Sequence, residues 1–393
     1  MKDVEINSLY SCLCCSRQNL IELWNLPNLP LTGIYVNDNS SLDFPFLFDQ
    51  VLMFCSNCSH IQLSNIIDSE FLYRDTYSHC TEQSQLSHLS NLNLLEVITK
   101  KFLNKNQILE IGCNDIFLLK KLKHIAKNLA GIDPIYDDYK QEIHPGIFVH
   151  GGFMESIDLD NLLDNPVDLV ITSHTFEHLT NPRSALESLK PYLAKKFDFI
   201  IEIPSSLRMV DQLRLDQIFH QHVSYYSPDS ISALLKVIDA TLVEVTYNYG
   251  LWGGTQILHF TNYVECSEVK NFKLTYNDFS NSKAFFYNEI EAVKFKIEHA
   301  PGRVFAYGAA QMLPILQYHL GAPFDQIEAI FDDNIDRIGK FFPGDNRRIK
   351  SFKEFEFRSN DTVLITALDS TKPLVQNLIN KKVNLIIVPL GNV

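Results

Sequence analysis

Along the middle of the chain, apolar runs of strand length alternate with segments of helical periodicity. The predicted elements lie, in chain order, at 87–102 (helix), 107–111 (strand), 117–127 (helix), 129–133 (strand), 168–172 (strand) and 197–202 (strand). Strands and helices that alternate in this way form a parallel sheet with helices packed on its faces. Two later strands, 243–247 and 256–260, are expected to be antiparallel. We therefore predict a Rossmann-type α/β domain over residues 86–300.

The pattern differs on either side of this domain. A predicted helix over 282–299 leads to Pro301-Gly302, a natural boundary. Beyond it, strands and helices alternate again at 304–307, 312–319, 327–331, 362–366, 373–380 and 384–388. Residues 301–393 are therefore predicted to form a smaller, Rossmann-like C-terminal domain. Residues 1–85 carry short apolar pieces between turns and cysteines, and we expect a small loop-rich module there.

Composition narrows the class of protein. A chain of 393 residues exceeds one ordinary domain, and 46% hydrophobic with 21% charged residues is typical of globular proteins. A formal net charge of -13 disfavours nucleic acid as a partner, because a phosphate backbone would be repelled. Neither a secretory signal nor a membrane span is found, so we expect no membrane association and a cytoplasmic location. The sequence does not specify the oligomeric state.

Two cysteine pairs predict a metal site in the N-terminal module. Cys12 and Cys15 form one C-x-x-C knuckle, and Cys55 and Cys58 form another. Four thiolates are the usual ligands of structural Zn²⁺, whose role is to stabilise the fold. Cys14 breaks the two-residue spacing and is left out. The alternative is that these are separate buried cysteines in the core.

The first strand of the predicted Rossmann domain ends in a cofactor-binding pattern. Glu110 precedes a turn at Gly112, and Asp133 ends the next strand, where a carboxylate can accept both hydroxyls of an adenosine ribose. Glu110 is placed to take an ammonium group, and we predict S-adenosylmethionine (SAM) as the cofactor. The absence of G-x-G-x-x-G argues against the alternative, a dinucleotide, and a turn without a ligand is the other alternative. Ile116 stands where a second glycine is expected, so its branched side chain must point away or narrow the pocket.

The string His174-Thr-Phe-Glu177-His178 matches the H-x-x-E-H signature of some metalloproteases. We reject that assignment, because these residues follow a predicted buried strand at the ligand edge of a sheet. His174, Glu177 and His178 are instead expected to line or support the cofactor cleft. Capping of the next helix is the alternative for each of them.

Further landmarks recur in one order along the chain. They are the two cysteine knuckles, Glu110-Ile-Gly112-Cys-Asn114-Asp115, Gly131-Ile-Asp-Pro134, Glu177-His178, Glu202-Ile-Pro204, Asp216-Gln-Ile-Phe-His-Gln-His222-Val-Ser-Tyr225, Gly253-Gly254, Tyr307-Gly-Ala-Ala310, Asp332-Asp-Asn334 and Pro343-Gly344. With them the sequence resembles the sugar C-methyltransferases, which act on nucleotide-linked 4-ketohexoses. The resemblance implies a zinc-binding N-terminal module, a central SAM-dependent methyltransferase domain and a C-terminal Rossmann-like domain that helps to hold a nucleotide-linked sugar. It also implies that Asn114 belongs to the cofactor site.

The resemblance implies removal of a proton next to a ketone, followed by attack of the enolate on the methyl group. The family uses a Tyr-His-Glu-His stretch, which here reads Phe219-His220-Gln221-His222. His222 matches the base, His220 is a second candidate, and Gln221 could orient the sugar or donate a hydrogen bond. Tyr77 aligns with a tyrosine near the substrate, although it could equally belong to the core. A hydroxyl or amine acceptor, and a degenerate binder without activity, stay open as alternatives.

Two small-residue segments are candidates for contact with the substrate. Gly253 and Gly254 would permit close approach of the backbone to the sugar, with a β-bulge as the alternative. Tyr307, Gly308 and Ala309 follow a predicted strand, where free amides at a helix start could bind a diphosphate. There the alternative is that small residues only allow the helix to pack tightly on the sheet.

Overall fold

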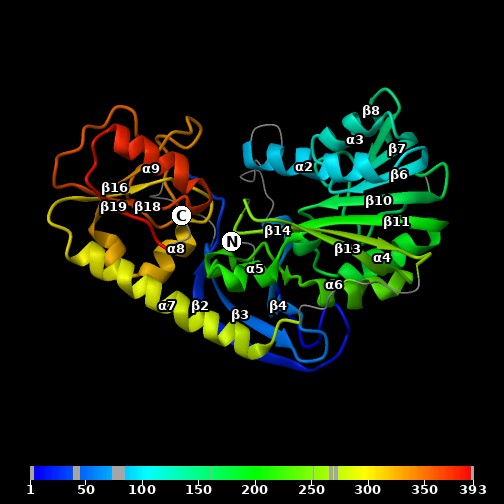
Figure 1. Cartoon of the computed structure of the whole chain (residues 1–393), viewed down its shortest axis with the longest axis horizontal. Helices are drawn as coiled ribbons and strands as arrows, with labels where there is room; N and C mark the ends of the chain where they lie inside the picture. Colours follow the sequence, from blue (N-terminus) through cyan, green and yellow to red (C-terminus); the bar gives the residue numbers. More distant parts are fainter. Residues whose placement is uncertain are drawn as a thin grey trace.

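A large mixed sheet forms the middle of the chain in the computed structural model, which describes residues 4–38, 45–72, 85–160, 162–250, 252–264, 269 and 273–390. Among these residues the sheet has eight strands in the order β13-β14-β11-β10-β6-β7-β9-β8 (Figure 1). The strands are β6 (Lys105–Ile111), β7 (Ala126–Ile132), β8 (Gln141–His144), β9 (Ile147–His150), β10 (Val167–Ser173), β11 (Leu193–Pro204), β13 (Thr241–Asn248) and β14 (Thr255–Thr261). Five consecutive strands of this sheet, β9-β7-β6-β10-β11, run parallel to one another. β14 runs antiparallel to β11 and to β13, which confirms the expectation for the two later strands.

Helices cover both faces of this sheet (Figure 1). One face buries apolar residues of α2 (Gln85–Lys101) and α3 (Phe117–Leu122), and the other buries those of α4 (Pro182–Leu189) and α6 (Pro228–Leu235). Successive strand residues point to opposite faces, so Ile108 belongs to the first core and Leu109 to the second. Helix α3 is shorter than the predicted helix over 117–127, because the chain returns to the sheet at Ala126, which pairs with Lys105.

A second, fully parallel sheet forms the C-terminal unit. Its order is β17-β16-β15-β18-β19, with β15 (Val304–Tyr307), β16 (Ile327–Asp332), β17 (Lys350–Ser351), β18 (Thr362–Ile365) and β19 (Leu385–Ile387). Helices α8 (Leu313–Leu320) and α9 (Thr371–Asn380) belong to this unit, and the long helix α7 (Tyr276–Glu298) leads into it (Figure 1). The predicted alternation of strands and helices after residue 301 is confirmed.

The N-terminal region is richer in β structure than the loop-rich module that its sequence suggested. β2 (Leu20–Pro30) and β3 (Leu47–Cys55) form a long antiparallel pair, and β4 (Ile61–Leu63) and β12 (Ser224–Tyr225) extend the sheet. A second small pair joins β1 (Ile6–Ser8) to β5 (Asn65–Ile67), followed by the short helix α1 (Ser69–Leu72). The expectation failed because part of the pairing joins distant segments: β1 pairs with β5, and β12 comes from the region of the large sheet.

This N-terminal sheet packs against the helices of the C-terminal unit. Trp24 donates a hydrogen bond from Nε1 to the Tyr287 hydroxyl at 2.9 Å, and its ring stacks on His319 with centroids 5.3 Å apart. One apolar core contains residues of β2, β3, α7 and β15, so the N-terminal and C-terminal parts share buried surface. In the described part of the chain, no helix has the length and apolar character needed to cross a membrane.

Candidate functional site

The carboxyl ends of β6 and β7 bring together the predicted cofactor residues. Glu110 pairs in register with Gly131, so the turn at Gly112 lies beside Asp133. The Asp133 carboxylate accepts hydrogen bonds from the backbone N–H groups of Asn114 at 2.8 Å and Ile135 at 3.1 Å. These bonds fix the carboxylate at the edge of the sheet where ligands of such folds bind.

Glu110 provides a buried carboxyl group with an unsatisfied oxygen at this edge. Its side chain is buried, and its Oε2 atom has no hydrogen-bond partner among the described residues. Burial, together with the nearby Asp133 and Asp115 carboxylates, raises the pKa of Glu110 well above its ordinary value. A cationic ligand would relieve this cost. SAM carries an ammonium and a sulfonium group, so these residues fit SAM.

The turn itself depends on a glycine. Gly112 has a φ of 76°, and a Cβ atom there would lie 2.0 Å from the Thr175 hydroxyl oxygen. Ile116, at the position of the missing second glycine, also has a left-handed backbone, with φ 56°. Its side chain is buried in the core beside Phe117 and Leu118. Of the two alternatives for this branched side chain, its burial in the core agrees with the one in which it points away from the pocket, and the backbone keeps a left-handed turn.

The Glu-His string follows β10, next to β6 in the sheet. It forms a single 3-10 turn, η2 (Phe176–His178), which agrees with the rejection of a metalloprotease helix. His174 Nδ1 lies 3.2 Å from Glu177 Oε1, and its ring meets Trp252 edge-on at 4.6 Å. Burial favours the neutral ring, but the hydrogen bond to Glu177 raises the pKa of His174.

His222 joins this turn from a distant part of the chain. Its ring centroid lies 4.9 Å from that of His178, and ligand atoms of Glu177, His178 and His222 all lie within 4.8 Å of one another. His178 Nδ1 donates to the Gln221 backbone oxygen at 2.8 Å. Although burial opposes ionisation, the hydrogen bond to His174 and the surrounding imidazoles lower the pKa of Glu177 to about 2. Burial and His178 lower the pKa of His222 to about 3. The cluster therefore combines an anionic carboxylate with a neutral imidazole.

The two neighbours of His222 in the predicted catalytic stretch point elsewhere. His220 is buried against the N-terminal sheet, donates from Nε2 to the Leu29 oxygen at 3.0 Å, and has its pKa lowered to about 4 by burial. The Gln221 side chain is occupied by Thr32, whose hydroxyl donates to Gln221 Oε1 at 3.2 Å and whose backbone oxygen accepts from Gln221 Nε2 at 3.1 Å. Neither side chain is brought to the His222 cluster. Tyr77 lies outside the described residues.

The glycine pair predicted to face the sugar instead makes room for two arginines. A Cβ atom on Gly253 would lie 2.8 Å from Arg214 Cγ, and one on Gly254 would lie 2.7 Å from Arg208 Cβ. Both glycines have positive φ values, 73° and 119°. Arg214 donates to Asp216 at 2.8 Å and to Asp369 at 2.8 Å, so it joins the region of the large sheet to the C-terminal unit. Gly253 therefore leaves room for the buried Arg214 ion pairs and Gly254 for the Arg208 side chain, whatever the two glycines contribute to substrate binding.

The small residues after β15 are also used for packing. A Cβ atom on Gly308, which has φ 111°, would lie 2.4 Å from Ala367 Cβ. Tyr307 is buried, stacks on Phe352 at 3.8 Å and hydrogen-bonds to Asp333. Ala309 is buried as well, and helix α8 begins only at Leu313. This arrangement matches the tight-packing alternative for Tyr307, Gly308 and Ala309 better than a diphosphate site.

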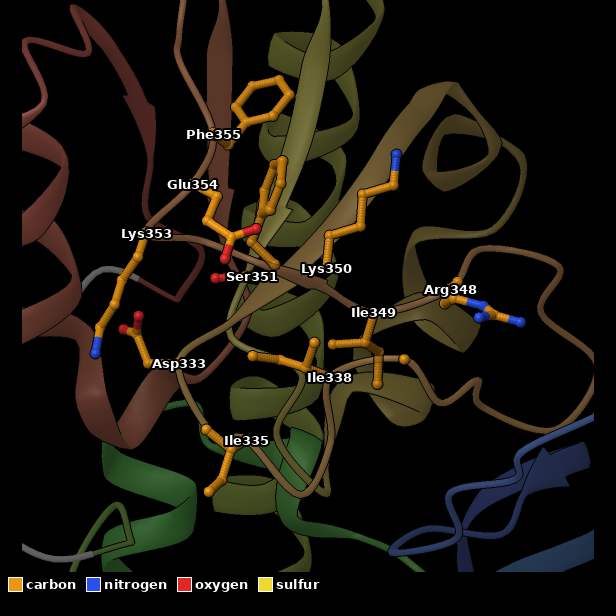
Figure 2. A pocket seen from close by; sticks show the side chains of 12 residues that line it. Asp333, Ile335, Ile338, Arg348, Ile349, Lys350, Ser351, Lys353, Glu354 and Phe355 are labelled. Carbon is orange, nitrogen blue, oxygen red and sulfur yellow. The ribbon is translucent and has the colours of Figure 1, made fainter.

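A cavity of about 630 Å³ opens instead beside β16 and β17 of the same unit (Figure 2). Figure 2 shows Asp333 and Ile335 after the carboxyl end of β16 and the side chains of Lys350, Lys353 and Glu354 around the opening. Its volume lies in the range of ordinary small-molecule sites. The sequence did not predict this cavity, because its wall combines the ends of β16 and β17 with loop residues that only folding brings together.

The cysteines predicted to hold zinc converge. Cys12 Sγ lies 3.6 Å from Cys58 Sγ, Cys15 Sγ lies 3.6 Å from Cys55 Sγ, and all four sulfur atoms lie within 4.8 Å of one another. Three of the four side chains are buried. Thiolates at this spacing have the number and softness that Zn²⁺ requires, so the cluster can hold a zinc ion. Cys14 is buried outside this set, as expected.

Sequence reasoning missed several residues that shape the site. Thr175 closes over Gly112, Trp252 covers His174, and Arg214 fills the space above Gly253. Thr175 lies inside the His-x-x-Glu-His string, in which the sequence predicted a role only for the two histidines and the glutamate. Trp252 and Arg214 belong to no sequence motif that would predict their roles, since each acts through a contact that forms only on folding.

Comparison with known proteins agrees with this arrangement. Residues 83–245 match a family model described as a methyltransferase domain, and residues 265–389 match one described as the C-methyltransferase C-terminal domain. The C-methyltransferase NovU of Streptomyces niveus is 22% identical over 96% of this chain and 94% of its own length.

Two solved methyltransferase structures each match less than half of this chain. The N-methyltransferase NodS of Bradyrhizobium japonicum, in complex with S-adenosyl-L-homocysteine, is 15% identical over 47% of this chain and 90% of its own, with a TM-score of 0.35. A SAM-dependent methyltransferase of Aquifex aeolicus is 19% identical over 47% of this chain and 99% of its own, with a TM-score of 0.34. The two family models and the relative that spans almost the whole chain carry the assignment. The chain is a SAM-dependent C-methyltransferase related to NovU.

Proposed function

We propose that this enzyme methylates a carbon atom next to the ketone of a nucleotide-linked deoxysugar, with His222 as the base. The observation that carries the proposal is the placement of His222 against Glu177 and His178, which follow β10 at the cofactor edge of the large sheet. The likeness to NovU over almost the whole chain supports transfer to carbon.

The residues at the ends of β6 and β7 would hold the cofactor. Glu110 would receive the ammonium group, and Asp133 would accept the ribose hydroxyls. Gly112 and Asn114 would hold the turn between them, and His174 would close the neighbouring side. When bound, SAM supplies an electrophilic methyl group.

His222 would remove the proton from the carbon atom next to the ketone. Its low pKa keeps the imidazole neutral at working pH, so its lone pair is available. The electron pair of the broken C–H bond becomes the enolate, which forms the new C–C bond while the S–CH₃ bond breaks. S-adenosylhomocysteine leaves, and the proton stays on His222.

Glu177 would stabilise the imidazolium that this step creates. It is buried and anionic, and its charge raises the proton affinity of the adjacent His222 ring. His178 would be oriented by its bond to the Gln221 backbone. Because the side chains of His220 and Gln221 are engaged elsewhere, the proposal assigns proton removal to His222 alone.

The nucleotide would occupy the cavity of the C-terminal unit shown in Figure 2. Lys350 and Lys353 line it and offer positive charge to a diphosphate, and Phe355 offers an apolar ring face. If Lys353→Glu leaves the KM for the nucleotide-linked sugar unchanged, this placement is wrong.

Proton exchange tests the role of His222. When the enzyme is incubated in deuterium oxide with SAM and a nucleotide-linked 4-ketohexose, it should exchange the proton beside the ketone and add a methyl group at that carbon atom. We expect His222→Ala to slow both events by about 100-fold or more, since general bases contribute on that order. His124→Gln, which changes an exposed histidine, is the matched control and should keep wild-type rates. Wild-type methylation by His222→Ala would refute the proposed base.

A further inference from the structure

Three potential metal ligands converge at the turn after β10, apart from the cysteine cluster. Glu177 and His178 come from η2, and His222 comes from the loop before β12. One ligand atom of each lies within 4.8 Å of the other two. Glu177 is buried, whereas His178 and His222 are half-buried, so the two imidazoles are partly exposed to solvent.

The hydrogen bonds indicate which atoms of the cluster could serve as ligands. The Gln221 backbone oxygen can only accept, so His178 must carry its proton on Nδ1 and its lone pair on Nε2. Glu177 uses Oε1 toward His174, while its buried Oε2 has no hydrogen-bond partner among the described residues. An anionic oxygen without a donor is costly in a buried position. A cation placed between these atoms would satisfy it.

The bonds around the cluster resemble those that support metal ligands elsewhere. A histidine ligand usually donates its other ring N–H to a backbone carbonyl, as His178 does to Gln221, and a ligating carboxylate is itself hydrogen-bonded, as Glu177 is by His174. Two imidazoles and one carboxylate favour divalent transition metals over Mg²⁺ or Ca²⁺, which prefer oxygen ligands. Such three-ligand sites keep coordination positions open for water or substrate.

We infer that Glu177, His178 and His222 form a second metal site, which takes a divalent ion of the zinc class, and that an ion bound there prevents His222 from acting as the base. The two roles exclude each other, because one lone pair of His222 cannot hold both a metal and a proton. Binding of the ion is independent of the reaction, whereas the inhibition rests on the proposed function.

A titration with Co²⁺ tests the binding. The protein is first loaded with Zn²⁺ at the cysteine site, so that added Co²⁺ reports on other sites. We expect one further equivalent, with the weak visible bands of nitrogen and oxygen ligands and without the strong sulfur-to-cobalt charge-transfer band. Glu177→Gln and His222→Gln should each lose this equivalent and keep the zinc, while His124→Gln should bind as the wild type does.

Two results would overturn the site: no further equivalent in the wild type, or a full further equivalent with unchanged bands in both Glu177→Gln and His222→Gln. The second variant guards against misfolding of the first. Activity then tests the inhibition: we expect Co²⁺ to reduce methyl transfer at least ten-fold and a chelator to restore it. If the equivalent binds and turnover is unchanged or higher, the inhibitory role is wrong. If the 4-ketohexose is never methylated under any condition, the proposed function fails while the binding result stands.

Discussion

Gly112 and Thr175 lie in van der Waals contact across the cofactor edge of the sheet, with no room for a side chain between them. A Cβ atom at position 112 would lie 2.0 Å from Thr175 Oγ1 and 3.0 Å from its Cγ2. The contact joins the turn after β6 to the residue before η2, and thus connects the two segments on which the proposed cofactor and catalytic residues lie.

Gly112→Ala should therefore weaken both the fold and SAM binding. The left-handed backbone alone costs an alanine about 1–2 kcal/mol, and Thr175 must also move. We expect a lower urea midpoint and at least ten-fold weaker SAM binding by calorimetry. Adding Thr175→Ala, which removes Oγ1 and Cγ2, should recover part of the loss. Unchanged SAM affinity in Gly112→Ala would show that the contact has no role in the site.

Ile116→Gly restores the glycine that the fingerprint lacks, yet it should destabilise the protein. Glycine would relieve about 1–2 kcal/mol of left-handed backbone strain. Loss of a buried aliphatic side chain costs about 2–5 kcal/mol, and Ile116 is only 4% exposed. We expect the cost of the cavity to exceed the relief of strain. The free energy of unfolding, measured by chemical denaturation, should therefore fall. A more stable Ile116→Gly would mean that strain at this turn dominates.

Arg214 should contribute more to stability than an exposed ion pair does. It is largely buried between Asp216 and Asp369, so Arg214→Met leaves two carboxylates without their partner. We expect a loss of about 3 kcal/mol in the free energy of unfolding. Arg183→Met, which breaks the exposed pair with Glu187, should cost less than about 1 kcal/mol. Equal losses in the two variants would contradict the role of Arg214 as a buried link between domains.

Removal of zinc should destabilise the N-terminal sheet. Cys55 ends β3 and is one of the four converging thiols, so Cys55→Ser should lose the tightly bound zinc and lower the melting temperature by roughly 5 °C or more. Metal analysis after dialysis, with a thermal scan, checks both effects. Cys14→Ser should retain the zinc, because Cys14 lies outside the ligand set. Retention of zinc by Cys55→Ser would refute the four-cysteine site.

SAM binding should be coupled to release of a proton from Glu110. The pKa of Glu110 is raised in the free protein, mainly by burial, and a bound cation would lower it. Affinity should therefore increase as pH rises toward that raised pKa and become constant above it. Calorimetry in buffers of different ionisation enthalpy measures the proton. Glu110→Gln should bind at least ten-fold more weakly and lose most of the proton release, whereas the exposed Glu187→Gln should behave as the wild type.

The sequence alone determined the features that depend on local pattern. Alternating strand and helix periods located both Rossmann-like sheets, because burial on both faces of a parallel strand requires a continuous apolar run. The spacing within each C-x-x-C knuckle identified the four cysteines that converge, since two intervening residues are enough to bring two thiols to one ion. Local pattern also indicated Glu110, Gly112 and Asp133, because they lie at or next to the ends of two predicted strands and neighbouring parallel strands end at one edge of a sheet.

Only the tertiary structure decided which of the remaining candidates meet. His222 reaches Glu177 and His178 through folding, whereas His220, two residues before it, faces the N-terminal sheet because the chain turns between them. Gly253 was predicted to admit a sugar, but the space above it is filled by Arg214 from a separate segment. Such contacts join residues with no fixed spacing along the chain, and packing of the whole molecule sets them.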